Sequence, residues 1–254
     1  MIQERLKALR AEMEKRGITV YVVPTADFHE SEYVGDHFKA RKFITGFTGS
    51  AGTAVITLDE AGLWTDGRYF VQAENQLKDS TVTLYRMGEE GVPTVDEFVK
   101  DRLKEGGCLG FDGRVVNGTW GGKLEKIAAE KNVSMHVTED LIDLIWEDRP
   151  ALSKQPLFIL EEKYSGKSTA DKIGDLRKAM KENGADVHIL TSLYDIAWLL
   201  NIRGNDIDYV PVVLSYLVLN ETECIWFLQE EVVDDKIRAY LEENHLSLIH
   251  ISEP

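Results

Sequence analysis

One internal repeat constrains the fold more than any other feature of this sequence. A helix-like segment, a glycine and an apolar strand-like segment recur 167 residues later, without a gap over eighteen positions. The first copy consists of Leu6, Leu9, Arg10, Met13, Gly17, Val20 and Val22, and the second of Ile173, Leu176, Arg177, Met180, Gly184, Val187 and Ile189. Chance similarity is the alternative, because any helix followed by a strand reproduces part of this pattern. The repeat predicts two related α/β domains.

Helical and strand periodicities alternate along both copies, starting with a charged amphipathic helix at the N-terminus. Helices are also expected at 69–77, 94–105, 121–131, 141–146, 168–183, 192–201 and 232–244, and strands at 18–23, 53–58, 63–65, 80–86, 108–112, 133–137, 186–190, 212–220 and 223–228. The Pro-containing, weakly apolar stretch around 150–156 is the best linker candidate. The expected boundaries are therefore a first domain at 1–149, a linker at 150–156 and a second domain at 157–245. By analogy with the first copy, the second still lacks at least a strand and a helix.

Composition excludes several classes of protein. The net charge of −15 repels a phosphate backbone, so nucleic acid is not an expected partner. Two cysteines cannot build a disulfide framework, which fits a reducing compartment. The longest apolar run, 210–219, is half the ~20 residues that a membrane helix needs. The N-terminus lacks the apolar core of a signal peptide. We expect a soluble, cytoplasmic protein without a membrane partner.

A glycine-rich loop raises the first question of function. Gly46, Gly49 and Gly52 are spaced three residues apart, which matches neither the dinucleotide fingerprint G-x-G-x-x-G nor a P-loop. The loop is not a G-x-S-x-G nucleophile elbow either, because Thr48 stands where the first glycine is required. A turn between strands and the floor of an active site both stay open.

An acidic and histidine-containing stretch invites a metal-site interpretation. His29, Glu30 and Glu32 are followed by Asp36 and His37, but the H-E-x-x-H spacing is absent. A solvated polar loop is the preferred interpretation.

Two arginine loops occupy matching positions in the two copies. Asp66-Gly67-Arg68 follows a strand and opens a helix, and Arg203-Gly204-Asn205-Asp206 lies between a helix and a strand. The planar guanidinium suits a carboxylate, either a ligand's or a neighbouring aspartate's. The alternative to ligand binding is an internal ion pair of Arg68 with Asp66, or of Arg203 with Asp206 or Asp208. Spacing alone does not define a complete catalytic site.

Four blocks of sequence carry a resemblance to a known family. They are VPTADFHESEYV at 23–34, FITGFTGSAGTAVITLDEAGLWTDGRYFVQAENQL at 43–77, DLIWEDRPALSKQPL at 143–157 and IAWLLNIRGNDIDYVPVVLSYLVL at 196–219. Together, and in this order, they resemble the N-terminal half of the long-form Xaa-Pro aminopeptidases, which are similar to prolidases and creatinases. The resemblance covers residues 1 to 245.

The resemblance implies an α/β fold with two tandem creatinase-N-type domains, each a mixed β-sheet flanked by helices. In the family, a C-terminal "pita-bread" domain follows and binds two divalent metal ions, usually manganese, through two Asp, one His and two Glu. A metal-bound water then hydrolyses the bond between an N-terminal residue and a following proline. The implied partners are peptides with proline in second position and a second subunit in a homodimer. The glycine loop becomes part of the scaffold, and Asp66, Arg68, Arg203 and Asp206 become candidates for substrate-end or interface contacts.

The chain also departs from the family. The metal ligands are expected on a catalytic domain that residues 1–254 do not contain, so no cofactor and no peptidase activity are expected of this chain alone. A non-catalytic peptide- or protein-binding module of the same fold is the alternative. Residues 246–254, LSLIHISEP, resemble a translated sequencing adapter and are expected to have no settled place in the fold. A native strand at 247–251 is the alternative.

Overall fold

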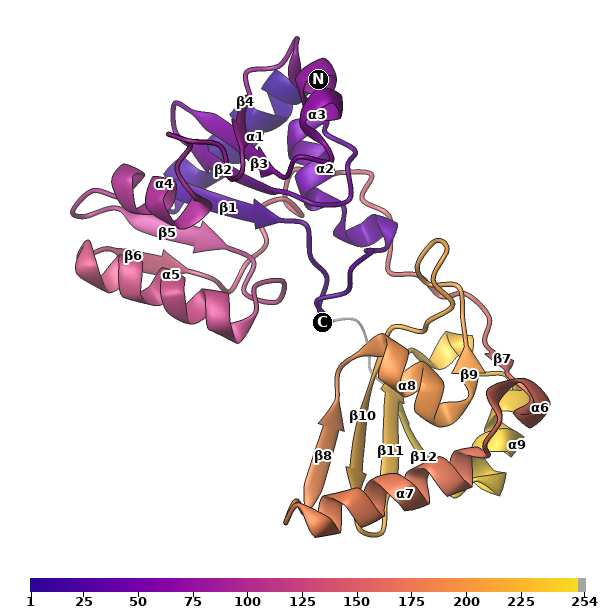
Figure 1. Ribbon diagram of the computed structural model, residues 1–254. Coiled ribbons are helices and arrows are strands. Elements are labelled where there is room, and N and C mark those ends of the chain that lie inside the picture. Colours follow the sequence, from indigo (N-terminus) through magenta and orange to yellow (C-terminus); the bar gives the residue numbers. More distant parts are fainter. Residues whose placement is uncertain (251–254) are drawn as a thin grey trace. The chain divides into compact units, whose positions relative to one another are not determined.

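The computed structural model describes residues 1–250, which form two units (Figure 1). The first unit comprises Met1–Glu30 and His37–Pro150, and the second comprises Ser31–Asp36 and the chain from Ala151 onward. Each unit has its own sheet and its own apolar core, as the repeat predicts.

The first unit contains a six-stranded mixed sheet in the order β4-β3-β2-β1-β5-β6. Strand β2 is antiparallel to both of its neighbours, β1 and β3, whereas every other neighbouring pair is parallel. The strands are β1 (Val20–Pro24), β2 (Thr53–Thr57), β3 (Ala61–Thr65), β4 (Thr83–Arg86), β5 (Cys108–Phe111) and β6 (Ser134–His136). This confirms the mixed sheet expected from the resemblance.

Helices cover both faces of the first sheet. The helices α1 (Ile2–Lys15), α2 (Ala40–Thr45) and α3 (Phe70–Leu77) pack on one face, with the 3₁₀ turn η1 (Asp36–Phe38) preceding α2. The helices α4 (Val95–Arg102) and α5 (Gly118–Glu130) pack on the other face. On α1, the side chains predicted to face the core, Leu6, Leu9 and Met13, are fully buried. A capping box of Thr94 and Glu97 starts α4.

The second unit contains a four-stranded sheet in the order β12-β11-β10-β8 and a small two-stranded sheet of β7 and β9 (Figure 1). Its strands are β7 (Phe158–Ile159), β8 (Val187–Leu190), β9 (Ile202–Arg203), β10 (Ser215–Asn220), β11 (Cys224–Leu228) and β12 (Ser247–His250). Its helices are α6 (Glu162–Ser165), α7 (Thr169–Glu182), α8 (Leu193–Leu200) and α9 (Asp235–Glu243), with the 3₁₀ turn η2 (Glu230–Val232).

The two units are copies of one pattern, down to individual hydrogen bonds. The strand directions of β8, β10, β11 and β12 repeat those of β1, β2, β3 and β4: two antiparallel pairs followed by a parallel pair. Arg10 Nε donates to Thr57 O at the end of β2 (2.9 Å), and Arg177 Nε donates to Asn220 O at the end of β10 (3.0 Å). Chance similarity does not account for such matched contacts.

One predicted helix is absent from the structure. Residues 141–146 form consecutive turns, because the Asp140 side chain accepts a hydrogen bond from Ile142 N and pairs with Arg149, which fixes the chain locally. The short elements α2, α6, β7 and β9 were not predicted; each has six residues or fewer and carries little periodic signal.

The expectation that residues 246–254 have no place in the fold is wrong for residues 246–250. Strand β12 pairs in parallel with β11 along the register Ile225↔Ser247 to Leu228↔His250. Leu246 is buried and Leu248 packs against the second core, so the alternation of inward and outward side chains fits a pleated edge strand. Ile251, which the same expectation named, lies outside the described residues. An adapter origin of these residues stays a prediction.

Candidate functional site

One edge of the first sheet gathers the features that the sequence singled out. Strands β1, β3 and β5 run in the same direction, so their carboxyl ends lie at one edge, where the antiparallel β2 begins. The glycine loop 46–52 enters β2 from this edge, and Asp66-Gly67-Arg68 leaves β3 there. Because open α/β sheets bind ligands at the carboxyl ends of their parallel strands, this edge is the first place to look for a site.

The glycine loop is wrapped around a buried cation. The guanidinium of Arg41, on α2, donates to Phe47 O (2.5 Å), to Gly49 O and to Thr25 Oγ1 (2.9 Å). Arg41 is 3% exposed, and burial lowers its pKa to about 10. The loop therefore turns its carbonyl oxygens inward onto a cation, whereas a phosphate cradle presents backbone N–H groups.

The three glycines serve this packing. Gly46 ends α2 at φ +79° and Gly52 has φ +157°, conformations that favour glycine. Gly49 has an ordinary φ, but a Cβ there would lie 2.9 Å from Tyr69 Cδ1 and closer still to the Phe47 ring. The scaffold role is thus confirmed for the turns at Gly46 and Gly52, and Gly49 is required by the close approach of two rings.

Asp66 and Arg68 form the internal ion pair that the sequence left as the alternative. Arg68 Nε and Nη2 donate to the two oxygens of Asp66 at 2.9 Å each, and Arg68 N donates to Asp66 Oδ1 at 3.1 Å. The hydrogen bond from Arg68 holds the pKa of Asp66 below its usual value. The Arg68 side chain is nevertheless 68% exposed.

Sequence reasoning missed a second Asp-Gly-Arg turn, which follows β5. Arg114 N and Nε donate to Asp112 Oδ1 at 3.0 Å and Arg114 Nη2 donates to Asp112 Oδ2 at 3.1 Å, the same geometry as at Asp66–Arg68. The repeated tripeptide was the available signal. Strands β3 and β5 are separated by two strands, or about 14 Å at the usual spacing, so the two turns do not converge on one ligand.

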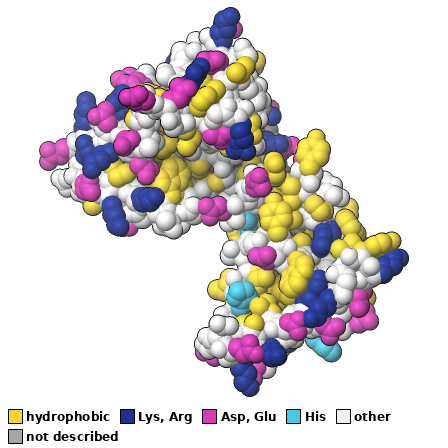
Figure 2. Space-filling view, in the orientation of Figure 1, with side chains coloured by type: hydrophobic (Ala, Val, Ile, Leu, Met, Phe, Trp, Pro, Cys, Tyr) yellow, Lys and Arg dark blue, Asp and Glu magenta, His cyan; other side chains and the backbone are white. Residues whose placement is uncertain are grey.

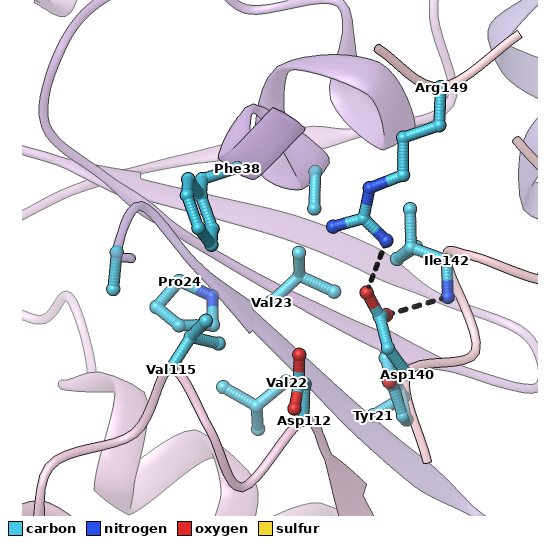
Figure 3. Close-up of a pocket in the computed structure, with 12 residues that line it drawn as sticks. Tyr21, Val22, Val23, Pro24, Phe38, Asp112, Val115, Asp140, Ile142 and Arg149 are labelled. Atoms are coloured by element: carbon cyan, nitrogen blue, oxygen red, sulfur yellow. Dashed lines mark hydrogen bonds and ion pairs between the residues drawn. The ribbon is translucent and has the colours of Figure 1, made fainter. Parts of the chain in front are cut away.

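A small cavity with a largely apolar lining and three charged side chains lies at the ends of β1 and β5 (Figure 3). Phe38, Pro24 and Val115 line one side of it, and the other side holds the ion pair of Arg149 Nη1 with Asp140 Oδ2 (2.6 Å). The cavity measures about 20 Å³, which accommodates one water molecule and no substrate. The Arg149–Asp140 ion pair and the hydrogen bond from Ile142 N to Asp140 Oδ1 hold together the last residues of the first unit.

His37, from the acidic and histidine-containing stretch, also contacts the last residues of the first unit. His37 Nδ1 lies 2.8 Å from Pro150 O, and because a carbonyl only accepts, Nδ1 carries the hydrogen. Arg149 Nε donates to His37 O at 3.0 Å. Burial lowers the pKa of His37, and the nearby Arg149 acts in the same direction. Within residues 1–250, no three His, Cys, Asp or Glu side chains are grouped so as to hold a metal ion.

In the second unit, the predicted pair of Arg203 with Asp206 or Asp208 is wrong. Arg203 Nη1 instead donates to the carbonyls of Ala197 and of Ile202 (3.1 Å). Asp206 accepts from Leu214 N at 2.8 Å and from Gln155 N at 3.3 Å, and burial raises its pKa. Asp206 thus holds the backbone of the loop 204–214, whereas Arg203 is bound to the carboxyl end of α8.

A buried lysine next to this loop was not predicted. Lys172 Nζ donates to Trp198 O (2.7 Å) and Asn201 Oδ1 (2.6 Å) and lies 4.6 Å from the centre of the Trp198 ring. Burial lowers its pKa. With Arg203 on the carbonyl of Ala197, two cations cap the carboxyl end of α8, which is favourable for the helix dipole.

The face of the first unit that Figure 2 shows carries no single-sign patch. Lys and Arg side chains are interspersed with Asp and Glu over its visible face (Figure 2). Of the helices in residues 1–250, none is both long and apolar enough to span a bilayer.

Comparison with known proteins identifies this pair of units. The creatinase/prolidase N-terminal domain matches twice, at residues 5–145 and at residues 148–253. The chain belongs to this family. A probable Xaa-Pro aminopeptidase P from Sordaria macrospora is 43% identical over 244 residues, which cover 95% of this chain and 40% of that protein. Aminopeptidase P1 of Lotus japonicus is 39% identical over 250 residues, covering 97% and 38%.

A solved structure of an aminopeptidase matches the same two creatinase/prolidase N-terminal domains. X-prolyl aminopeptidase from Caenorhabditis elegans, described as a cytosolic enzyme with a di-nuclear active site, superposes with a TM-score of 0.91 at 34% identity. The match covers 98% of this chain and 42% of that enzyme. The chain therefore corresponds to the N-terminal region of Xaa-Pro aminopeptidases and spans about 40% of their length.

Proposed function

We propose that this chain is the N-terminal, two-domain part of a cytoplasmic Xaa-Pro aminopeptidase. The enzyme removes an N-terminal residue that precedes proline, using two divalent metal ions, with manganese as the proposed metal. The supporting observation is the match over 98% of the chain, at 34% identity, to a peptidase with a di-nuclear active site. The metal ligands are proposed to lie on a domain outside residues 1–254, so the chain by itself is expected to be inactive.

The first experiment is to sequence the gene across the codons for His245 and beyond. A frame that continues into a domain with two Asp, one His and two Glu as ligands supports the proposal. The complete protein should then release the first residue of an Xaa-Pro peptide, but not of an Xaa-Ala control, and should lose activity to a chelator and regain it with Mn²⁺. A stop codon after Pro254, or a continuation without those ligands, would favour a peptide- or protein-binding module of the same fold.

Arg68 is the proposed contact for the substrate end or for a second subunit of a homodimer. Its exposure supports this role, and its pairing with Asp66 pre-orients the guanidinium. Arg203 and Asp206 are proposed to act indirectly, Arg203 by holding the end of α8 and Asp206 by holding the loop 204–214. In the complete enzyme, Arg68→Ala should raise KM for Xaa-Pro peptides or shift the dimer equilibrium. Arg114→Ala, the matched variant at the second Asp-Gly-Arg turn, should do neither; equal effects would remove Arg68 from the site.

A further inference from the structure

One β-turn in the second unit holds a bulky side chain in a backbone conformation that favours glycine. The turn lies in the loop between β9 and β10 (Figure 1), where Val210 N donates to Ile207 O (3.1 Å) and the two residues form an antiparallel bridge. Of the two central residues, Tyr209 has φ +66°, whereas Asp208 does not have a positive φ. This is the pattern of a type II turn, whose third residue is usually Gly or Asn. A tyrosine in this position strains the backbone.

The side chain of Tyr209 adds nothing to the packing of the second unit. Its relative exposure is 103%, so it is as accessible as in an extended chain. Within residues 1–250 its ring contacts no other ring and its hydroxyl makes no hydrogen bond. Tyr240, in the same unit, is the opposite case, because its hydroxyl donates to Leu200 O at 3.0 Å and lies 2.7 Å from Thr169 Oγ1. Folding therefore does not explain a tyrosine at position 209, and strained residues of this kind are typical of ligand-binding sites.

The loop around the turn is fixed, so the ring is presented in one place. The buried side chain of Asp206 accepts from Leu214 N (2.8 Å), and Asp206 N donates to Val212 O (3.3 Å). Val212 N donates in turn to Val210 O at 2.8 Å. A contact that is preorganised in this way loses little conformational freedom on binding. The central side chains of the turn are therefore held ready for a ligand.

The two central side chains define the chemistry of that ligand. Tyr209 offers the face of an aromatic ring, and Asp208 offers an exposed carboxylate that forms no ion pair within residues 1–250. A proline-containing peptide matches the ring, because its pyrrolidine has no N–H to donate and is recognised through its apolar faces, for which proline-binding grooves use aromatic side chains. In an Xaa-Pro peptide the N-terminal ammonium lies one residue before that pyrrolidine, within reach of a neighbouring carboxylate.

A second copy of the chain is a poorer match at this turn. A single tyrosine buries about 150–250 Å², whereas a stable interface buries about 800 Å² per partner. Two chains with a net charge of −15 also repel each other, and an exposed carboxylate in the turn adds to this repulsion. A small, positively charged ligand has neither disadvantage.

We propose that Tyr209 is a substrate-binding residue whose ring packs against the proline ring of an Xaa-Pro peptide, while Asp208 attracts the N-terminal ammonium of that peptide. This inference rests on the proposed function and adds to it a recognition element for proline itself. It requires no step of the reaction to occur on residues 1–254, because the two side chains bind the substrate and hold its proline in position.

The test uses the protein encoded by the complete gene and the matched variants Tyr209→Asn and Tyr164→Asn. Asparagine tolerates a positive φ, so at position 209 it keeps the turn and removes the ring. We expect Tyr209→Asn to raise KM for an Xaa-Pro peptide at least about tenfold and to leave the melting temperature within about 2 °C. Tyr209→Phe, which retains the ring, should keep KM within about threefold of the parent. Tyr164→Asn, at another exposed tyrosine of the second unit, should change neither value.

A binding assay on the metal-free complete protein, in which the peptide is not cleaved, gives a second readout. Isothermal titration calorimetry should show the same loss of affinity for Tyr209→Asn, and the loss caused by Asp208→Asn should shrink as the salt concentration rises.

The outcomes separate this inference from the proposed function. An active enzyme whose KM and dissociation constant are unchanged in Tyr209→Asn would overturn the inference and leave the proposed function intact, as would a variant that alters only the dimer equilibrium. A rise in KM together with a fall of more than about 5 °C in melting temperature would assign Tyr209 a structural role and also overturn the inference. A parent protein that does not cleave Xaa-Pro peptides would refute the proposed function, and this inference with it.

Discussion

Arg41 allows the structural account of the glycine loop to be tested most directly. Its guanidinium donates to Thr25 Oγ1 and to the carbonyls of Phe47 and Gly49, and none of the described carboxylates pairs with it. Arg41→Met keeps an unbranched apolar stem in place and removes every donor. Two buried carbonyls then lose this donor, and the half-buried Thr25 hydroxyl keeps only its hydrogen bond to Gly52 O.

Two opposing free energies decide the result. Hydrogen bonds to a charged group contribute about 1.5–3 kcal/mol each, so three of them amount to about 4.5–9 kcal/mol. Against this, burial lowers the pKa of Arg41 to about 10, which at about 1.36 kcal/mol per pH unit is a desolvation cost of about 3 kcal/mol that methionine avoids. The hydrogen-bond contribution is the larger of the two. We expect Arg41→Met to lower the free energy of unfolding of the first unit by about 1.5–6 kcal/mol.

Urea-dependent hydrogen exchange measures this loss within one molecule. Peptides from β1 and β2 report on the first unit, while peptides from β10 and β11 provide an internal reference that should not change. Arg41→Lys should fall in between, because one ammonium group does not span three acceptors arranged around a planar fork. Arg86→Met, which removes an exposed arginine, is the control and should cost less than about 1 kcal/mol. If Arg41→Met is within about 0.5 kcal/mol of the parent, the carbonyl cage does not stabilise the loop and the reasoning is refuted.

Three further predictions concern the ends of the two units. Arg149→Ala breaks the ion pair with Asp140, whose side chains are 9% and 6% exposed, and should cost the first unit about 3 kcal/mol in the same exchange assay. Arg68→Ala, which breaks an exposed pair, should cost less than about 0.5 kcal/mol. Equal costs would contradict a stabilising role of the buried Arg149–Asp140 pair. Since the pKa of His37 is lowered, the unfolded state binds more protons just below pH 6.5, and the stability of the first unit should fall as the pH decreases through that window. His37→Gln should flatten this slope in urea titrations at several pH values, and an unchanged slope would assign the effect to another group. Leu246→Ser, just before β12, should cost the second unit about 2 kcal/mol, whereas Ser247→Ala, at the exposed first position of β12, should be neutral. Two neutral variants would argue against a packed β12.

Features that depend on local sequence were predictable. The helix–glycine–strand repeat revealed both units because the spacing of apolar side chains reflects one-sided burial directly. Arg10 and Arg177 took equivalent positions in the sequence, and the structure gives them equivalent carbonyl acceptors. The Asp66–Arg68 pair belongs to the same class, since its partners are two residues apart and the turn alone brings them together.

Features that depend on distant segments were not predictable in this way. Arg203 donates to the last turn of α8, and Asp206 accepts from backbone amides instead, so proximity in sequence suggested the wrong partner. Arg41 resembles any surface arginine in sequence, because its acceptors are main-chain carbonyls that leave no trace in side-chain identity. Lys172 was missed because its acceptors, Trp198 O and the Asn201 side chain, are far away in sequence.

Residues 246–250 show that a segment can fit a sheet edge whatever the origin of its sequence. A strand can join a sheet edge when its side chains alternate between apolar and polar and its backbone can complete the hydrogen bonds of the edge. Any sequence with leucines at 246 and 248 provides the alternation. The turn after α9, in which Leu246 N donates to Leu241 O (2.9 Å), delivers this segment to the edge of β11. Residues 247–250 therefore occupy the place that β4 has in the first unit, whatever their origin.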